Sequence, residues 1–337
     1  MRGRRWIGLG LALALLSSCQ LEGRDEPVDD LAYQVDLPPH FEPMPVPHDN
    51  ALTTERVALG KRLFHDPILS RDGSISCSSC HLQAFAFSDT AQFSKGIEGR
   101  RGFRNAPALF NLAWHPYFFM DGGVPTLELQ VLAPIDNHAE MDEELLNVID
   151  RLKADIEYPT RFRRAYGREP DPYGLVRAIA AYERSLVSAT SVYDQYLQGI
   201  DLMSPDMERG MALFNGTRLR CGSCHSGPNL TDYQFYNIGL PVTTADSGRM
   251  RVTLSEADRG AYKTPSLRNV YLTAPYMHDG SMSSLDEVFD HFASGGAHYP
   301  NQDPRTAGVI ITPEERAALK AFFYSLTDDA FVRNPEH

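Results

Sequence analysis

Two copies of a five-residue cysteine and histidine motif constrain this 337-residue chain more than any other feature. They read CSSCH at residues 77–81 and CGSCH at residues 221–225. Both match C-x-x-C-H, the pattern typical of covalent haem c attachment, in which two thiols bind the porphyrin and the histidine ligates iron. A single copy would equally fit a redox dithiol or half of a zinc site, but two copies favour two covalently bound haem c groups. The predicted haem-binding residues are Cys77, Cys80 and His81 for the first haem, and Cys221, Cys224 and His225 for the second.

The fifth cysteine, Cys19, ends a stretch that has the features of an export signal. Arginines occupy positions 2, 4 and 5, and residues 7–16 form an apolar run too short to span a bilayer. Residues 16–19 resemble a lipobox, so residues 1–18 are predicted to be a lipoprotein signal peptide and Cys19 the lipidated first residue. An ordinary signal peptide cut nearby is the alternative. Either interpretation predicts a periplasmic protein, because haem c attachment requires export.

The chain carries a large excess of negative charge, with 44 acidic against 32 basic residues and a formal net charge of −12. This excess argues against nucleic acid and anionic lipid as partners and favours steering of a basic protein partner. Solubility alone is an equally good explanation of the acidity. No other stretch approaches transmembrane length, so membrane contact is expected only through the lipid anchor.

The chain pattern predicts an all-α fold of two related units. Residues 19–50 are rich in proline and acidic residues and lack helical periodicity, so they are predicted to be a tether. An amphipathic helix precedes each haem motif, and the motifs are 144 residues apart, which indicates an internal duplication into two cytochrome c-like haem domains. The predicted units are an N-terminal haem domain at 51–200, a C-terminal haem domain at 201–330 and a tail at 331–337.

Start signals and apolar stripes predict the other helices. Ser204-Pro205 reads as an N-cap followed by a first helical position, and residues 284–287 and 312–315 read as capping boxes. One apolar stripe runs from Leu145 through Leu146 to Leu152, and another covers residues 175–186.

Further motifs carry a family resemblance. Arg104-Asn105-Ala106-Pro107, residues 118–123 and residues 127–130 stand between the haem motifs, and residues 263–270 and 273–281 follow the second. With these motifs in this order, residues 53–327 resemble the bacterial dihaem cytochrome c peroxidases and the related MauG-like enzymes. The resemblance implies two cytochrome c-like domains with a calcium ion between them. It also implies that one haem reacts with hydrogen peroxide and that the other supplies it with electrons.

The resemblance assigns roles to individual residues. His81 matches the ligand of the peroxide-reacting haem, and Gln130 and Glu140 match the catalytic glutamine and glutamate on its open side. A carboxylate there can accept the first proton of bound peroxide and return it to the departing oxygen, while Gln130 would hydrogen-bond the peroxide or its water. Without the resemblance, Glu140 reads as a solvent-facing residue at a helix start. The calcium ligands implied by the resemblance are Asn105 and the main-chain oxygens of Thr273 and Pro275.

Two positions near the first haem depart from the family pattern. The loop position at which many of these peroxidases have a blocking histidine is Ile97, so the first haem is expected to be open without prior reduction of the second, unless His115 or His138 enters the site. The tryptophan that lies between the haems in the family is replaced by Met120, which predicts weaker electron sharing between them. The nearby Trp114 is expected to be a core aromatic.

A third departure concerns the far side of the second haem. The ligand there is methionine in the peroxidases and tyrosine in the MauG-like enzymes, but this chain has Phe292, which offers no lone pair. His291, Met277 and Met282 are candidate substitutes, and a five-coordinate second haem is the alternative. Loss of a methionine ligand should lower the potential of that haem.

Three functions follow from these patterns. The leading one is a dihaem peroxidase that reduces hydrogen peroxide to water with electrons from a small cytochrome c or a cupredoxin. The second is MauG-like, peroxide-dependent oxidation of side chains in a partner protein. The third is a non-enzymatic electron carrier or sensor, against which the pair of Gln130 and Glu140 argues. The resemblance also makes a homodimer possible.

Overall fold

The computed structural model describes residues 31–243 and 245–337, so the expected signal peptide and Cys19 lie outside the described residues. The described chain is mostly helical, with one small antiparallel sheet that pairs Phe235 with Lys263. In chain order the elements are α1 (Thr54–His65), α2 (Leu127–Gln130), α3 (Leu132–Asp136), α4 (Leu145–Ala154), α5 (Tyr158–Tyr166), α6 (Pro172–Ser185), α7 (Val192–Leu197), α8 (Pro205–Asn215), β1 (Phe235–Tyr236), α9 (Met250–Thr253), β2 (Tyr262–Lys263), α10 (Leu285–Ser294), α11 (Pro313–Ser325) and α12 (Asp329–Val332).

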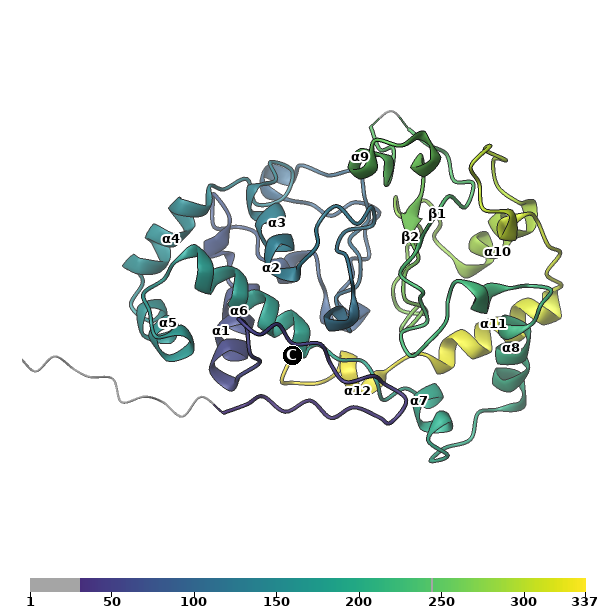
Figure 1. Ribbon diagram of the computed structural model, residues 1–337, viewed down its shortest axis with the longest axis horizontal. Coiled ribbons are helices and arrows are strands. Elements are labelled where there is room, and N and C mark those ends of the chain that lie inside the picture. Colours follow the sequence, from purple (N-terminus) through teal and green to yellow (C-terminus); the bar gives the residue numbers. More distant parts are fainter. Residues whose placement is uncertain (1–30, 244) are drawn as a thin grey trace, which may run out of the picture.

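These elements form two halves that lie side by side (Figure 1). Helices α1 to α6 make up the first half, and α8, α10, α11 and the small sheet make up the second. Each half has its own cluster of buried apolar side chains. The predicted predominance of helix is therefore confirmed.

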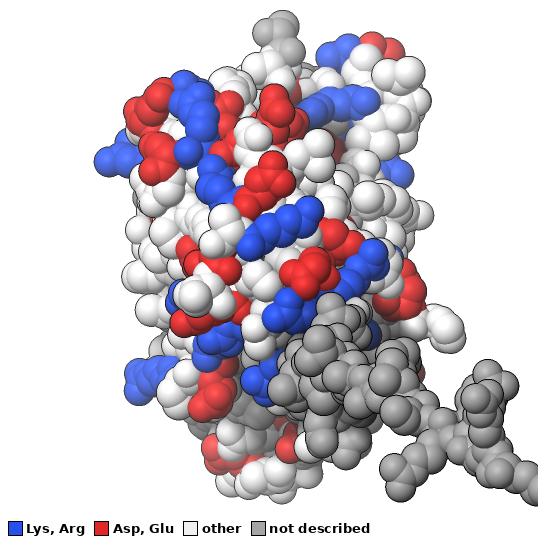
Figure 2. All heavy atoms as spheres, turned by 90° about the vertical axis from the view of Figure 1, so that its left-hand side faces the viewer, with Lys and Arg blue, Asp and Glu red and all other residues white. Residues whose placement is uncertain are grey.

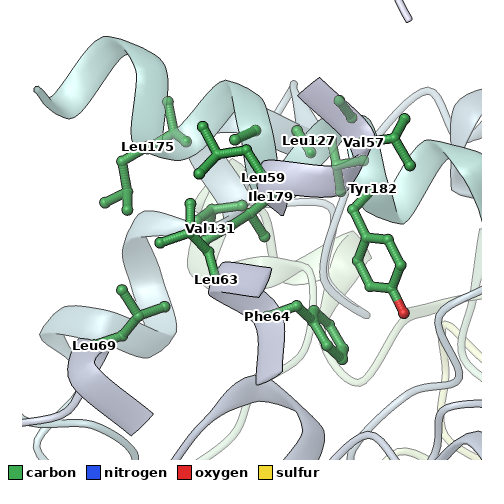
Figure 3. Close-up of a cluster of buried hydrophobic side chains, with 14 of the residues drawn as sticks. Val57, Leu59, Leu63, Phe64, Leu69, Leu127, Val131, Leu175, Ile179 and Tyr182 are labelled. Atoms are coloured by element: carbon green, nitrogen blue, oxygen red, sulfur yellow. The ribbon is translucent and has the colours of Figure 1, made fainter. Parts of the chain in front are cut away.

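Helix α1 crosses α6 in direct backbone contact in the first half. A Cβ atom on Gly60 would lie 1.9 Å from the carbonyl oxygen of Ala178, so only glycine permits this approach. Side chains from both helices surround the crossing, and Leu63, Phe64 and Ile179 are almost completely buried (Figure 3). The apolar stripe predicted along residues 175–186 faces this cluster.

Helix α8 crosses α11 in the second half in the same way. A Cβ atom on Gly210 would lie 2.0 Å from the carbonyl oxygen of Ala318. The rings of Phe214 and His225 have centroids 6.5 Å apart and planes at 45°, and the rings of Phe64 and His81 in the first half have the same separation and angle. One arrangement of two crossed helices behind a haem motif thus occurs twice.

The helix-start predictions are largely confirmed. Ser204 caps α8, and Thr312 and Glu315 form a complete capping box on α11. At α10, Ser284 caps the helix, but the capping box is incomplete, because the Glu287 carboxylate accepts from the main-chain N–H of Ser283 instead of from that of Ser284. Another detail was wrong, because Leu146, assigned to the apolar stripe of α4, is 68 % exposed.

Both terminal segments of the described chain pack onto the body. From Leu31 onward the expected tether is held in place, with His40 Nε2 lying 2.9 Å from Asp194 Oδ1 and Phe41 buried against Trp114. The expected tail packs as well. Phe331, although it follows the second half in sequence, is 3 % exposed within the apolar cluster of the first half.

The surface at the α4 and α5 end of the molecule carries charges of both signs. Figure 2 shows Lys and Arg side chains interspersed with Asp and Glu side chains over this face. Ion pairs of Arg163 with Glu169 and of Arg161 with Glu157 are examples. The acidic excess is therefore not gathered there. Among the described residues, no helix has both the length and the apolar character needed to cross a membrane.

The close contact between α1 and α6 predicts that a methyl group added at Gly60 would destabilise the protein. Gly60→Ala should destabilise the haem-loaded protein by about 1–3 kcal/mol, because overpacking against the Ala178 carbonyl outweighs the roughly 1 kcal/mol gain in helix propensity. Thermal unfolding measures the change. Gly102→Ala is the control, since nothing lies within 4 Å of a Cβ there. An unchanged midpoint for Gly60→Ala would contradict the proposed close contact.

Candidate functional site

The first haem motif forms a tight turn at the mouth of a cavity. Cys77–Ser79 is a short 3-10 helix, and the main-chain N–H of His81 donates to the carbonyl of Cys77 at 3.0 Å. This turn brings Cys77, Cys80 and His81 to the wall of one cavity that is partly open to solvent. The sequence spacing alone requires such a turn, since both thiols must reach the same porphyrin.

Gln130 and Glu140 line the same cavity. Gln130 is the last residue of α2, and Glu140 lies in the loop after α3. The rest of the lining is mostly apolar, and includes Leu69, Leu109, Val131, Ile135 and Ile179. The structure therefore brings together the five residues that the sequence assigned to the first haem and its open side.

The hydrogen bond at His81 suits an iron ligand. Its Nδ1 lies 2.8 Å from the carbonyl oxygen of Phe87, which can only accept, so Nδ1 carries the proton and the lone pair lies on Nε2. Burial also lowers the pKa of His81, which keeps the ring neutral. Ala86 and Phe87 adopt left-handed conformations, with φ of 54° and 59°, and this turn directs the acceptor at the ring.

The second motif repeats this arrangement. His225 Nδ1 lies 3.1 Å from the carbonyl oxygen of Pro265 and 3.3 Å from that of Leu230, and Leu230 also has a left-handed φ of 50°. The His225 lone pair is thereby placed on Nε2. Both motifs fit the group that their sequence predicts, a haem held by two thioether bonds and one imidazole.

The other interpretations of the cysteines fit less well. Burial raises the pKa of Cys80 and that of Cys221 to about 11, whereas redox-active and zinc-binding cysteines need a stabilised thiolate. Within the part of the chain that the structure describes, no group of three or more His, Cys, Asp or Glu side chains is placed to hold a metal ion. Neither a dithiol enzyme nor a zinc site is supported.

Glu140 is held by one hydrogen bond to its carboxyl group and by another to its main chain. Asn137 Nδ2 donates to Glu140 Oε1 at 2.6 Å, and the main-chain N–H of Ile97 donates to the carbonyl of Glu140 at 2.8 Å. Glu140 has exposed surface, yet enough protein surrounds the carboxyl group that desolvation raises its pKa, while the Asn137 bond opposes this shift. Ile97 is completely buried, so no ligating side chain projects from that loop position.

Of the two histidines that could block the first haem, His115 is engaged elsewhere, whereas His138 is exposed. His115 Nδ1 lies 3.2 Å from Lys263 Nζ, which also donates to the carbonyl of Tyr117 at 2.7 Å. Burial, aided by the nearby Lys263 charge, lowers the pKa of His115 well below its usual value. The main-chain N–H of Lys263 donates to the carbonyl of Met120 at 2.7 Å, so a residue of the second half holds this segment in place.

Trp114 was predicted to be a core aromatic, but it is only half-buried and lies outside both apolar clusters. Its indole N–H donates to the carbonyl of Glu42 at 3.2 Å, and its ring contacts Phe41 edge-on. The indole therefore anchors the N-terminal segment.

The candidate ligands for the far side of the second haem lie in different local environments. His291 Nε2 lies 2.8 Å from the carbonyl oxygen of Ile238 and donates to it, so this nitrogen offers no lone pair in this arrangement. Met277 lies in a left-handed turn, and Met282 pairs with Tyr276 in an isolated bridge. Phe292 is half-buried on α10.

The Asn105 side chain is held in place by main-chain carbonyl groups. Its Nδ2 donates to the carbonyls of Ala91 and Gln92, and its main-chain N–H donates to the carbonyl of His278, in the loop that follows Pro275. The side chain is 6 % exposed. Amide and main-chain oxygens suit calcium, although a site without carboxylates binds it weakly.

The sequence reasoning missed two features of this site. Glu183, on α6, lines the cavity and is 4 % exposed, although nothing in its helical position marks it as more than part of a buried face. The C-terminal segment covers the back of the first motif, where the rings of Phe331 and His337 lie 5.7 and 6.1 Å from that of Phe87. A contact between residues so far apart in the sequence has no local signal.

Comparison with known proteins agrees with this geometry. The family model for di-haem cytochrome c peroxidase matches residues 54–201. The methylamine utilization protein MauG of Methylorubrum extorquens is 39 % identical over 290 residues, covering 85 % of this chain and 82 % of that protein. The cytochrome-c peroxidase IdrP1 of a Pseudomonas species is 34 % identical over 319 residues, covering 85 % and 84 %.

A solved structure extends the similarity to the fold. The crystal structure of a MauG-like protein associated with microbial copper homeostasis has a TM-score of 0.86 and 33 % identity, and the match covers 90 % of this chain and 98 % of that one. This chain belongs to the family of dihaem cytochrome c peroxidases and MauG proteins. It is an oxidoreductase of the peroxidase type with two haem c groups.

The contact between Phe331 and Phe87 predicts that the C-terminal segment stabilises the first half. Phe331→Ala should cost about 3–5 kcal/mol, as expected for a buried phenylalanine whose site cannot collapse. Phe103→Ala, at a side chain that is 46 % exposed, should cost less than about 1 kcal/mol. Thermal unfolding of the haem-loaded variants compares them. Equal effects would mean that the segment does not support the first half.

Proposed function

We propose that this protein reduces hydrogen peroxide to water with electrons from a small redox protein. The observation that carries this proposal is the presence of Gln130 and Glu140 on the same cavity as the first haem motif. A pure electron carrier needs no proton-handling side chain beside its iron. The carrier and sensor alternative is therefore disfavoured.

The two motifs have different roles in this proposal. Cys77 and Cys80 hold the first haem and His81 ligates its iron, while residues 221–225 hold the second. When bound, the first haem supplies the iron that takes peroxide and the electrons that cleave it. The second haem receives electrons from the partner. The neutral imidazoles, each fixed by a main-chain acceptor, support both assignments.

Glu140 is assigned to proton transfer and Gln130 to positioning. In its carboxylate form Glu140 accepts the first proton of the incoming peroxide and later returns it to the departing oxygen. Desolvation raises the pKa of Glu140, and this suits the first step, because a carboxylate with a raised pKa is a better proton acceptor. The Gln130 amide hydrogen-bonds the peroxide.

The first haem is proposed to be open, because Ile97 stands at the loop position where a histidine would block it. The Ile97 N–H bond to Glu140, together with the lack of space at Gly96, where a Cβ atom would lie 2.1 Å from the Ala139 carbonyl oxygen, fixes this loop beside the catalytic residue. The site then needs no prior reduction of the second haem. For that haem we propose either five-coordinate iron or ligation by Met277 or Met282, and disfavour His291 because of its bond to Ile238.

An internal duplication gives the two haem domains. The supporting observations are the two matched helix crossings, at Gly60 and at Gly210, and the equal separations of phenylalanine and histidine rings. We place the domains at 51–200 and 201–330, with 331–337 as a terminal segment. A calcium ion held by Asn105 and by main-chain oxygens of Thr273 and Pro275 belongs to this proposal.

The location and partners follow from the sequence. Lipidated Cys19 would tether a periplasmic enzyme to a membrane. A small cytochrome c or a cupredoxin would donate the electrons, and a homodimer is the proposed assembly. Nucleic acid is not a proposed partner.

A second candidate function is peroxide-dependent oxidation of a partner protein. The similarity to MauG and to a MauG-like structure favours it, as does the lack of methionine at Phe292. The replacement of the inter-haem tryptophan by Met120 and of the tyrosine ligand by Phe292 counts against it.

Replacing the catalytic carboxyl group tests the leading proposal. Glu140→Gln should lower peroxide-dependent oxidation of a reduced small cytochrome by about 100-fold or more, with both haems retained in the pyridine haemochrome assay. An unchanged rate would refute the role of Glu140. Poor cytochrome oxidation by the unaltered protein, with an oxidised state that lasts for seconds after peroxide, would favour the second candidate.

The bond from Asn137 predicts a shift in pH dependence. Glu140 must be ionised to accept a proton, so activity should be present above its pKa and be lost as pH falls through that value. Asn137→Ala removes a stabilising hydrogen bond from the carboxylate, so the pKa should rise and the acid limb should move up by about one pH unit. Asn147→Ala, which breaks a similar bond to Glu143, should leave the limb in place. A limb that does not move in Asn137→Ala would contradict the assignment.

A further inference from the structure

Glu183 is a buried acid in the first cavity that the mechanism above does not use. It extends from α6, is 4 % exposed and lines the cavity together with Cys77, Gln130 and Glu140. Its Oε2 atom is buried and has no hydrogen-bond partner among the described residues. A polar atom left in this state costs free energy, so it needs a reason to remain.

The charged neighbours of Glu183 do not neutralise it. Arg184, the next residue, makes two hydrogen bonds to Glu128, at 2.6 and 2.9 Å, and is therefore committed to another carboxylate. Glu128 itself adds a negative charge nearby, and the polar groups on the cavity side include Cys77, His81 and Glu140. Burial raises the pKa of Glu183 to about 8, so the side chain is mostly a neutral acid near pH 7.

Comparison with the corresponding position in the second half indicates that the fold does not require an acid at the position of Glu183. Glu183 stands five residues after Ala178, the residue whose carbonyl meets Gly60. Five residues after Ala318, which meets Gly210, the corresponding position of α11 is Phe323. Phe323 is 6 % exposed and packs in the apolar cluster of its half. The same helical position thus holds an apolar side chain in the second half and an acid beside Gln130 and Glu140 in the first.

We propose that Glu183 is a second proton-holding residue of the peroxide cavity and that it delivers one of the two protons consumed in each turnover. The inference deepens the proposed function and rests on it. One peroxide, two electrons from the redox partner and two protons give two waters. Glu140 only moves a proton that peroxide already carries, so both consumed protons must enter the cavity. Glu183 breaks its O–H bond to give one of them to an oxygen that leaves as water, and then takes up a proton from solvent.

The test compares Glu183→Gln with the unaltered protein and with Glu144→Gln, a change at an exposed carboxylate outside the cavity. The amide keeps the volume of the acid but has no proton to deliver. We expect unchanged haem content and an unchanged rate of the first reaction with peroxide, but about 100-fold slower steady-state oxidation of a reduced small cytochrome. Glu144→Gln should match the unaltered protein in all three.

Infrared spectroscopy provides a readout that is independent of turnover. At pH 7 the unaltered haem-loaded protein should show a C=O band of a protonated carboxyl group that shifts in D2O. This band should persist in Glu140→Gln and be lost in Glu183→Gln. Absence of the band in the unaltered protein would overturn the proposal even if Glu183→Gln failed to fold.

The kinetic outcomes also separate this inference from the proposed function. Full turnover of Glu183→Gln would overturn proton delivery by Glu183. Loss of haem from that variant, or loss of its first reaction with peroxide, would also overturn it, because the role of Glu183 would then be structural. If the unaltered protein itself did not oxidise the cytochrome, the proposed function would fail instead.

Discussion

The hydrogen bond from the His81 ring to the carbonyl of Phe87 is the interaction on which the first site depends. It fixes which imidazole nitrogen carries the lone pair, and therefore whether the ring can serve as a ligand at all. The acceptor is held by two left-handed residues in succession, at 86 and 87. Such a turn is costly for side chains other than glycine, and packing against Phe64 on one side and Phe331 on the other maintains it.

The two halves differ in chemistry more than in framework. The crossing of glycine and alanine, the ring contact behind the histidine and the main-chain acceptor on Nδ1 occur in both. The first half adds an amide and carboxyl groups to its cavity, whereas the second has aromatic packing around Phe323. A scaffold that works with an apolar interior can thus be given proton chemistry by a few substitutions at lining positions.

The sequence predicted what depends on local pattern. The haem motifs, the helix starts at Ser204 and Thr312 and the buried stripe of α6 all follow from short-range rules of spacing and capping. Gln130 and Glu140 could be assigned only through the resemblance, since Glu140 by itself reads as a surface acid. Periodicity placed Leu146 on the apolar side of its helix, but the side chain is exposed, because the apolar stripe of a helix is wider than the face that meets the core. Glu183 and Phe331 were missed since their surroundings are made by residues far away in the chain.

The position of Phe331 has a consequence for how the protein matures. A polypeptide made from its amino end presents Cys77 and Cys80 long before residues 329–337 exist, so the back of that motif stays uncovered until synthesis reaches them. The last residues then close over Phe87 from behind. Synthesis order and architecture together mean that the first haem domain is the earliest to be made, yet takes part of its packing from residues made last.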